Sequence, residues 1–277
     1  MSEVALFIDK SAVIPAHLKQ GVDDLTRSLA GGSGTKRISI RGSVFRMIVD
    51  GQEVAKNEDR SMDVVIVNGA EFTSRTYYAG TYQEGQTSGP DCWSNDGKTP
   101  DSRAENPQSV SCATCPQNIA GSGQGNSRAC RFSRRLAVIL ANDIDNSDVY
   151  QLVLPAQSIF GKSADGKMPF QQYVSFLAGH NLSIRSVVTR ISFDTNSATP
   201  KLTFRAVKPL EEKEYLSAVD KGNSFEALSA ITYNPIIAKK EEPKAAKPAE
   251  PVVREKKTPA PTKDLGAVLE QWGDDDE

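Results

Sequence analysis

The chain has few histidines and cysteines, two residue types that often serve in catalytic centres. Its 277 residues include 2 histidines, 4 cysteines and 2 tryptophans. No Ser/His/Asp set and no isolated carboxylate pair stands out, so the sequence gives no positive reason to expect an enzyme. Catalytic zinc sites usually use histidine or carboxylate ligands. Since His17 and His180 lie far from the cysteines in the sequence, we expect them to be surface or packing residues.

Long hydrophobic runs are also missing. The longest uninterrupted apolar stretch, Leu136 to Ala141, is far shorter than the roughly 18 residues of a membrane-spanning helix. We therefore expect no contact with a membrane. The first residues, MSEVALFIDK, lack the basic start, apolar core and cleavage site of a secretory signal. This favours a reducing compartment, where cysteines are better metal ligands than disulfide partners.

An excess of positive charge is absent too. The formal net charge is -2, and residues 238–277 hold 8 of the 33 basic and 10 of the 35 acidic residues, which leaves 25 of each sign in residues 1–237. A neutral body can still bind a polyanion where its positive charge gathers on one face, because the local potential decides the contact. Local clusters of charge therefore carry more information than the total.

One segment holds most of the distinctive chemistry. Residues 112–135, CATCPQNIAGSGQGNSRACRFSRR, contain three of the four cysteines, a Gly/Ser-rich loop and four arginines. With Cys92, the cysteine spacing is C-x19-C-x2-C-x14-C. Four thiolates at such a spacing suit a tetrahedral structural zinc site. We therefore predict one structural Zn2+ bound by Cys92, Cys112, Cys115 and Cys130, with a redox C-x-x-C pair or plain buried thiols as the alternatives.

A metal would also explain the irregular composition around these cysteines. The stretch from Glu71 to Cys130 is rich in Gly, Ser, Pro and Asn, and a loop of that length without internal order is uncommon in a compact domain. The binding energy of a metal can replace a hydrophobic core in such a segment. We therefore expect a zinc-ordered insertion over residues 71–133.

Cationic and aromatic residues flank the cysteines. Guanidinium and ammonium groups bind phosphates, and aromatic rings stack on unpaired bases with little regard to sequence. This mixture predicts a binding surface for single-stranded nucleic acid, although some of the rings are expected to pack inside the fold. The candidate contact residues are Lys36, Arg37, Arg41, Arg46, Arg75, Tyr77, Tyr78, Tyr82, Trp93, Arg128, Arg131, Phe132, Arg134 and Arg135.

Hydrophobic periodicity predicts one mixed α+β domain over residues 36–237. A single bent strand is expected over residues 36–50, with a β-bulge where the alternation changes phase between Val44 and Phe45. Long bent first strands are typical of small closed barrels. About six strands are predicted in all. The others lie near residues 61–70, 134–142, 149–155, 187–193 and 202–206, with helices over 168–180 and 210–230.

The two ends of the chain differ from this domain. Residues 1–35 are expected to be an N-terminal arm with a Gly/Ser linker at 31–34. Residues 238–263, rich in Lys, Glu, Ala and Pro, predict a disordered linker. The tail, residues 264–277, has a short apolar stripe followed by acids and predicts partner docking, with an inert end or masking of the basic surface as alternatives. Its partner-binding residues are Leu265, Val268, Leu269, Trp272, Asp274, Asp275, Asp276 and Glu277.

Two further patterns resemble known motifs but lack essential parts. Ala156 to Ser163, AQSIFGKS, matches a relaxed phosphate loop, yet bulky Ile159 and Phe160 stand where backbone amides must turn inward. NDIDNSDVY, residues 142–150, lacks the central glycine and the terminal glutamate of a calcium loop. We therefore expect a hairpin turn there and no nucleotide site at residues 156–163.

Several segments together resemble zinc-containing single-stranded DNA-binding proteins of bacteriophages. They are YYAGTY, PDCWSNDGKTPD, CATCPQNIAGSGQG and ACRFSRRLAVIL, followed by LVLPAQS, within a span from Arg75 to Val207. The resemblance implies an OB-type barrel, whose open face and loops bind strands. The acidic tail resembles those of replication proteins, although it ends in Glu277 rather than an apolar residue.

This resemblance implies a non-catalytic protein of phage DNA replication or recombination in the bacterial host cytoplasm. It would coat single-stranded DNA, while the tail recruits replication or transcription proteins such as a polymerase, nuclease or helicase. The main alternative is a transcription coactivator or adaptor that contacts RNA polymerase. A zinc-dependent nuclease is the third possibility, which the scarcity of histidine disfavours.

Overall fold

The computed structural model describes residues 36–80, 89–163 and 166–233. All of them belong to the first of the two units into which the chain divides, Met1–Ala238. The predicted arm, linker and tail, residues 1–35, 238–263 and 264–277, lie outside the described residues, as does Tyr82. Among the helices of the described part, none is both long and apolar enough to cross a membrane.

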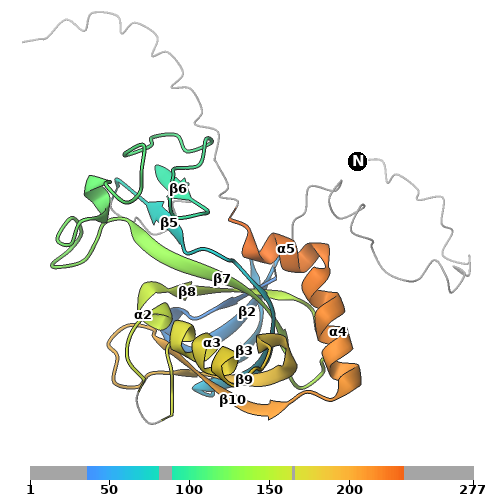
Figure 1. The fold of residues 1–277 in the computed structure, drawn as a ribbon. Coiled ribbons are helices and arrows are strands. Elements are labelled where there is room, and N and C mark those ends of the chain that lie inside the picture. Colours follow the sequence, from blue (N-terminus) through green and yellow to red (C-terminus); the bar gives the residue numbers. More distant parts are fainter. Residues whose placement is uncertain (1–35, 81–88, 164–165, 234–277) are drawn as a thin grey trace, which may run out of the picture. The chain divides into compact units, whose positions relative to one another are not determined.

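The described residues form a mixed α+β fold around a ten-stranded sheet (Figure 1). The strands are β1 Arg37–Ser39, β2 Phe45–Val49, β3 Gln52–Asn57, β4 Ser61–Gly69, β5 Ser74–Tyr77, β6 Cys92–Ser94, β7 Arg131–Leu140, β8 Tyr150–Pro155, β9 Val187–Phe193 and β10 Leu202–Pro209. The helices are α2 Ala156–Ile159, α3 Phe170–Gly179, α4 Glu212–Asn223 and α5 Phe225–Ile231, with 3-10 turns η2 Arg41–Ser43, η3 Pro116–Asn118 and η4 Ile184–Ser186.

The main path of the sheet runs β10-β9-β4-β7-β8-β1-β2-β3, while β5 pairs with β6 and β7. Neighbours are antiparallel except β1 and β8, which are parallel. The sheet curls, because the ring of Phe45 in β2 lies 4.5 Å from the ring of Phe193 in β9, although four strands separate β2 from β9 along the path. The expectation of a mixed α+β fold with a barrel-like sheet is therefore confirmed.

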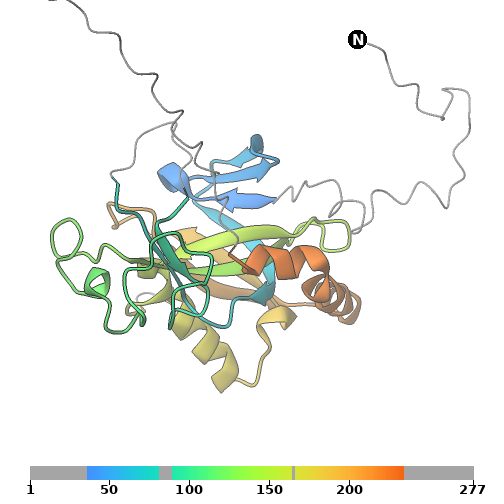
Figure 2. The same ribbon diagram turned by 90° about the horizontal axis from the view of Figure 1, so that it is seen from above.

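Two hydrophobic cores lie on opposite faces of the sheet. In β4, successive side chains face opposite cores: Val64 and Ile66 face the larger core, whereas Val65 and Val67 face the smaller one. The larger core fills the inside of the curl and includes Phe170, Tyr173 and Leu177 of α3. Helices α4 and α5 cover the other face through small residues, Ala218, Ala227 and Ala230 (Figure 2).

The prediction of one bent strand over residues 36–50 is wrong. The phase change between Val44 and Phe45 arises because β1 and β2 are separate strands that pair with each other. The chain reverses through Gly42 and Ser43, both with positive φ (73° and 56°). Glycine tolerates positive φ, so Gly42 suits a short turn at this point. Such a turn interrupts the alternation of apolar and polar residues in the same way as a bulge.

Three strands, β3, β5 and β6, were not predicted, so the expected number of about six strands is too low. β3 follows β2 through Asp50 and Gly51, both with positive φ (51° and 81°), which is the Asp-Gly signal of a tight hairpin. Its side chains are almost all exposed, so it carries no hydrophobic alternation. β5 and β6 are short strands inside the insertion, where only the cysteines had suggested order. Strands β4 and β7 to β10 and helices α3 to α5 lie where periodicity predicted them.

Close packing of α4 on β4 gives a test of the fold. A Cβ on Gly222 would lie 2.4 Å from the Val67 carbonyl oxygen, a backbone atom that cannot rotate away, so Gly222→Ala should lower the free energy of unfolding by about 1–3 kcal/mol. The control is Gly179→Ala near the end of α3, where a Cβ meets nothing within 4 Å. That change should leave stability unaltered or raise it by up to about 1 kcal/mol. Urea unfolding measures both, and equal effects would contradict the packing.

Candidate functional site

The insertion is joined to the sheet by one long strand. In β7, Leu136 to Leu140 pair with β4 and Ser133 to Val138 pair with β8, whereas its first residues, Arg131 to Ser133, pair with β5. β5 in turn pairs with β6, which carries Cys92 (Figure 1). Hydrogen bonding is therefore continuous from the curled sheet into the cysteine-containing segment. The insertion is fixed to the domain by its backbone and does not depend on side chains alone.

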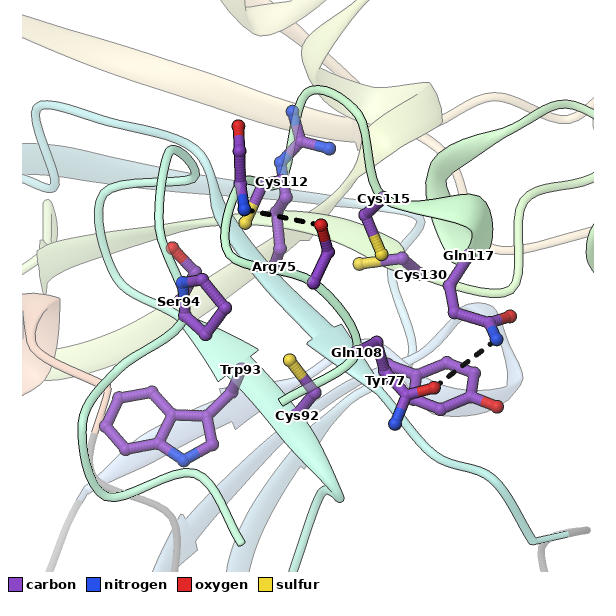
Figure 3. A pocket seen from close by; sticks show the side chains of 13 residues that line it. Arg75, Tyr77, Cys92, Trp93, Ser94, Gln108, Cys112, Cys115, Gln117 and Cys130 are labelled. Atoms are coloured by element: carbon purple, nitrogen blue, oxygen red, sulfur yellow. Dashed lines mark hydrogen bonds between the residues drawn. The ribbon is translucent and has the colours of Figure 1, made fainter. Parts of the chain in front are cut away.

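All four cysteines line one small pocket in the insertion (Figure 3). Cys92 comes from β6, Cys112 and Cys115 from the loop before η3, and Cys130 from the residue before β7. Cys112, Cys115 and Cys130 are buried, Cys92 is half-buried, and all four are free thiols. In Figure 3 the sulfurs of Cys115 and Cys130 point toward each other, and that of Cys92 points toward the same space.

Backbone hydrogen bonds hold the loop that carries these cysteines. The Cys112 amide donates to the Lys98 carbonyl at 2.8 Å, and the Cys130 amide donates to the Gln117 carbonyl at 2.8 Å. The Asn118 side chain donates to the Cys112 carbonyl at 2.9 Å. These contacts bring together residues that are far apart in the sequence. The four cysteines therefore share a site because of the surrounding backbone, in a segment with little apolar content.

The donor set fits a zinc ion chemically but is not closed around one. Among the described residues, no group of three His, Cys, Asp or Glu side chains is arranged to hold a metal ion. The shared pocket nevertheless places four thiols within reach, since rotation about χ1 relocates a sulfur without moving the backbone. Soft thiolates at this spacing suit Zn2+ rather than Mg2+ or Ca2+.

The thiols of Cys112 and Cys130 are protonated at neutral pH when no metal is bound. Burial raises the pKa of Cys112, and it raises the pKa of Cys130 to about 11. The positive charge of Arg75 opposes both shifts, and the neighbouring cysteines add to them. Because only thiolates ligate zinc, binding must release these protons.

Arg75 lies between the cysteine pocket and the aromatic ring of Phe132. It lines the pocket, and its guanidinium carbon lies 4.3 Å from the centre of the Phe132 ring, its direct partner across the β5–β7 pair. Its Nε and Nη1 atoms are buried and have no hydrogen-bond partner among the described residues. The sequence placed Arg75 among the DNA contacts, whereas its position is inside the insertion.

The arginines of β7 point to different sides of the strand. Arg131 is exposed, while Arg134 is half-buried, with its guanidinium carbon 6.0 Å from the Phe170 ring on the side of α3. Arg135 is 6% exposed and lies 4.0 Å above the Tyr233 ring on the other side. Successive residues of a strand face opposite ways. The run of four arginines in the sequence is therefore not one positive surface.

Arg135 belongs to a buried cluster with Tyr233 and Trp93. It donates a hydrogen bond to the Ser74 hydroxyl, and burial lowers the pKa of its guanidinium group. Trp93 is 2% exposed, and its ring meets Tyr233 edge-on at 5.3 Å. Burial raises the pKa of Tyr233, and nearby Tyr78 adds to the rise. The burial of Trp93 and Arg135 argues against their predicted contact with DNA and indicates that they hold the insertion against α5.

A second and larger cavity opens beside the cysteine site. It has a volume of about 610 Å3 and lies between the end of the insertion and the start of α2. Phe132, Pro155 and Phe160 supply apolar walls, while Arg128 and Arg131 are exposed cations at its edge. Arg128 also lies 5.6 Å from the centre of the Phe132 ring. This cavity is within the size range of ligand sites, roughly 300–1,000 Å3.

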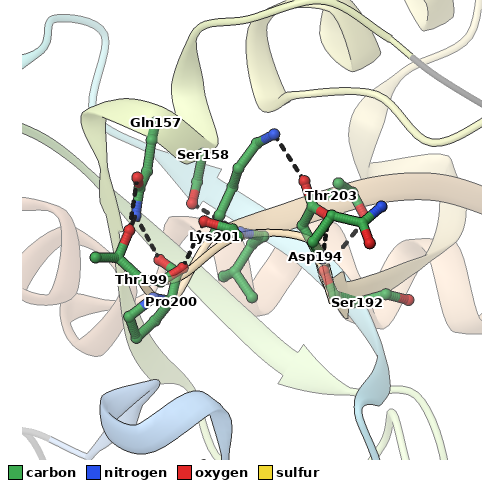
Figure 4. Close-up of polar contacts among 11 residues, drawn as sticks. Gln157, Ser158, Ser192, Asp194, Thr199, Pro200, Lys201 and Thr203 are labelled. Atoms are coloured by element: carbon green, nitrogen blue, oxygen red, sulfur yellow. Dashed lines mark hydrogen bonds and ion pairs between the residues drawn. The ribbon is translucent and has the colours of Figure 1, made fainter.

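Phe160 is the wall of the cavity that sequence reasoning missed. It is 46% exposed and directly follows α2, within the segment that resembles a phosphate loop. Figure 4 shows how α2 is anchored: the Gln157 side chain donates to the Thr199 hydroxyl at 2.7 Å, and the Ser158 hydroxyl accepts from the Leu202 amide at 2.8 Å. The sequence shows only two adjacent apolar residues, Ile159 and Phe160, and does not reveal that the Phe160 ring lines the same cavity as Phe132.

The other predicted contact residues lie elsewhere. Lys36 forms an ion pair with Asp148, and Arg46 forms one with Glu53 at 2.9 Å. Arg37 and Arg41 are exposed near β1, and none of these four basic residues lines the 610 Å3 cavity. Tyr77 lines the cysteine pocket, and Tyr78 is 44% exposed. The structure thus brings together Arg75, Arg128, Arg131 and Phe132 from the predicted set.

The different burial of the β7 arginines predicts different effects on stability. Arg135→Ala should lower the free energy of unfolding by about 2–4 kcal/mol, because it removes the buried hydrogen bond to the Ser74 hydroxyl and the cation–π contact with the Tyr233 ring. Arg131→Ala, on the same strand but exposed, should change it by no more than about 0.5 kcal/mol. Urea unfolding of the two variants provides the comparison. Similar losses in both would show that the buried cluster is not stabilising.

Comparisons of the chain with protein-family models, with curated proteins and with solved structures gave no match. The resemblance to phage DNA-binding proteins therefore depends on the cysteine segment and its neighbours alone. Any assignment of function must follow from the cysteine pocket and the arginine-edged cavity beside it.

Proposed function

We propose that this protein binds single-stranded DNA, without catalysis and largely without regard to base sequence. The observation that carries the proposal is the 610 Å3 cavity with Phe132 and Phe160 in its walls and Arg128 and Arg131 at its edge. An unpaired base offers a flat apolar face that stacks on such rings, and its phosphate offers a negative charge to the arginines. A base in a duplex is already stacked and has no free face.

Charge complementarity favours a nucleotide over an apolar ligand. Arg128 and Arg131 are exposed, and neither forms an ion pair with a carboxylate of the described residues. A guanidinium group with no carboxylate partner remains available for phosphate, to which it binds in a planar, two-pronged geometry. The walls of the cavity, in contrast, are mostly apolar. A ligand with a flat ring and an adjacent anion matches both features.

The proposal includes one structural zinc ion bound by Cys92, Cys112, Cys115 and Cys130. It is supported by their common pocket and by the low apolar content of the insertion. Cys130 lines both the cysteine pocket and the larger cavity. Closure of four thiolates around an ion would therefore also fix one side of the cavity in place, without the ion taking part in any reaction.

The biological setting belongs to the same proposal. The sheet is curled, as in an OB-type barrel, although its main path has eight strands and that fold has five. Together with the resemblance of the cysteine segment, it supports a role in phage DNA replication or recombination in the bacterial cytoplasm. The recruitment of partner proteins by residues 264–277 concerns residues outside the described part. The alternative, contact with RNA polymerase, would use these residues together with the arginine cluster around Arg128 and Arg131.

Binding to oligonucleotides tests the proposal directly. Fluorescence anisotropy of a labelled dT oligomer should show binding that weakens steeply with salt and is much tighter than binding to a duplex of equal length. Phe160→Ala should weaken it by about 1–3 kcal/mol, roughly 5- to 150-fold. The matched control is Phe225→Ala on α5, where Phe225 is similarly exposed (50%) but does not line the cavity. Equal affinity for single and double strands would refute the proposed function.

Metal analysis tests the zinc site. The purified protein should contain about one zinc per chain, and a strong chelator should lower its melting temperature, because the insertion loses the energy that orders it. Burial raises the pKa of Cys130 to about 11, so protons compete with zinc and the apparent zinc affinity should increase as pH rises toward that value. A protein without stoichiometric zinc whose melting is insensitive to chelation would exclude this site.

A further inference from the structure

Among the described residues, Arg75 is the one charged side chain that lines the cysteine pocket, and it also contacts the Phe132 ring that lines the cavity. It lies in β5, directly opposite Phe132 in β7 and opposite Ser94 in β6. Its guanidinium carbon is 4.3 Å from the centre of the Phe132 ring, and the side chain also lines the pocket of the four cysteines. It therefore stands between the two sites.

The guanidinium group of Arg75 lacks the partners that a buried charge needs. Its Nε and Nη1 atoms are buried and make no hydrogen bond within the described part of the chain. The loop at Gly97 packs closely over it, since a Cβ on Gly97 would lie 3.6 Å from Arg75 Nε and 2.4 Å from the Thr73 carbonyl oxygen. Buried donors without acceptors cost free energy, so they require an explanation, and a bound ion nearby is one of those known in proteins.

Cysteine thiolates are the acceptors that this pocket could offer to Arg75. No carboxylate is among the residues that line this pocket, whereas four thiols are. Neutral thiols are weak acceptors, but zinc-bound thiolates carry an excess negative charge, since four thiolates outweigh one divalent ion. A guanidinium group beside them would both neutralise charge and donate hydrogen bonds to sulfur. Contacts of this kind around the ligands of a metal strongly affect its affinity.

We propose that Arg75 is a positioning residue that couples the cysteine site to the DNA-binding cavity. When thiolates hold a zinc ion, they orient the Arg75 guanidinium group, and its cation–π contact then fixes the Phe132 ring as a wall of the cavity. Zinc and single-stranded DNA should therefore strengthen each other's binding by the same factor, because coupling between two sites is reciprocal. This inference rests on the proposed function for both the zinc ion and the DNA.

The experiment measures zinc affinity of the full chain by competition with a chromophoric chelator, with and without a saturating dT oligomer. In the wild-type protein the oligomer should raise zinc affinity by roughly 5- to 150-fold, the usual range of such coupling. Arg75→Gln should weaken zinc binding by about 10- to 100-fold. It should also reduce the coupling factor to near one, because the link to Phe132 is lost.

The matched control is Arg128→Gln. Arg128 also contacts the Phe132 ring, at 5.6 Å, but it does not line the cysteine pocket. Its replacement should weaken DNA binding while leaving zinc affinity and the coupling factor unchanged. A merely structural role for Arg75 would lower stability without changing the coupling factor, so this factor separates the two roles.

A second variant keeps the test decisive if Arg75→Gln does not fold. Arg75→Lys retains the charge but loses the planar group that stacks on Phe132, so it should keep most of the zinc affinity and lose most of the coupling. Wild-type zinc affinity in Arg75→Gln, an unchanged coupling factor in either variant, or a wild-type chain that binds no zinc would overturn the inference. If the wild-type chain binds zinc but no oligomer, the proposed function fails, while the effect of Arg75 on zinc affinity is still measured.

Discussion

The pairing of β7 with both the curled sheet and β5 is the constraint on which the rest of the structure depends. The half of β7 that lies in the sheet is held by β4 and β8 and by side chains in both cores, such as Leu136 and Ile139. The half that leaves the sheet pairs with β5, and Cys130 directly precedes it. A segment with little apolar content is thereby attached to a well-packed domain. The position of β7 therefore determines where the cysteine pocket and the neighbouring cavity lie.

Alternation along that strand assigns different tasks to neighbouring residues. Phe132 faces the cavity and Arg134 faces α3, whereas Arg135 faces Tyr233 in a buried cluster. A cluster of arginines in a sequence is a reliable indication of a polyanion site only when the residues share a face. Of the residues predicted in this segment, Arg128, Arg131 and the ring of Phe132 remain for the ligand, and the buried Arg135 packs within the insertion. Fewer contacts than the sequence indicated can still bind a strand, because ring stacking and phosphate contacts repeat along its length.

The sequence predicts the elements that have strong hydrophobic periodicity and misses those that depend on turns or on distant partners. β4, the β7–β8 hairpin and α3 follow from alternating or helical spacing. β3 does not, because its exposed side chains have no apolar face, although the Asp50–Gly51 turn before it was a usable signal. The shared pocket of the cysteines agrees with their spacing. The cavity wall at Phe160 was not predictable, because it depends on the anchoring of α2 to Thr199 and Leu202, more than forty positions away along the chain.

Tyr233 attaches the chain after α5 to the insertion. Its amide donates to the Asn95 side chain at 3.1 Å, the same side chain donates weakly to its carbonyl at 3.4 Å, and its ring lies against Trp93 and Arg135. A chain shortened to the end of α5 would expose the indole of Trp93 and the guanidinium group of Arg135, and such a fragment should be prone to self-association.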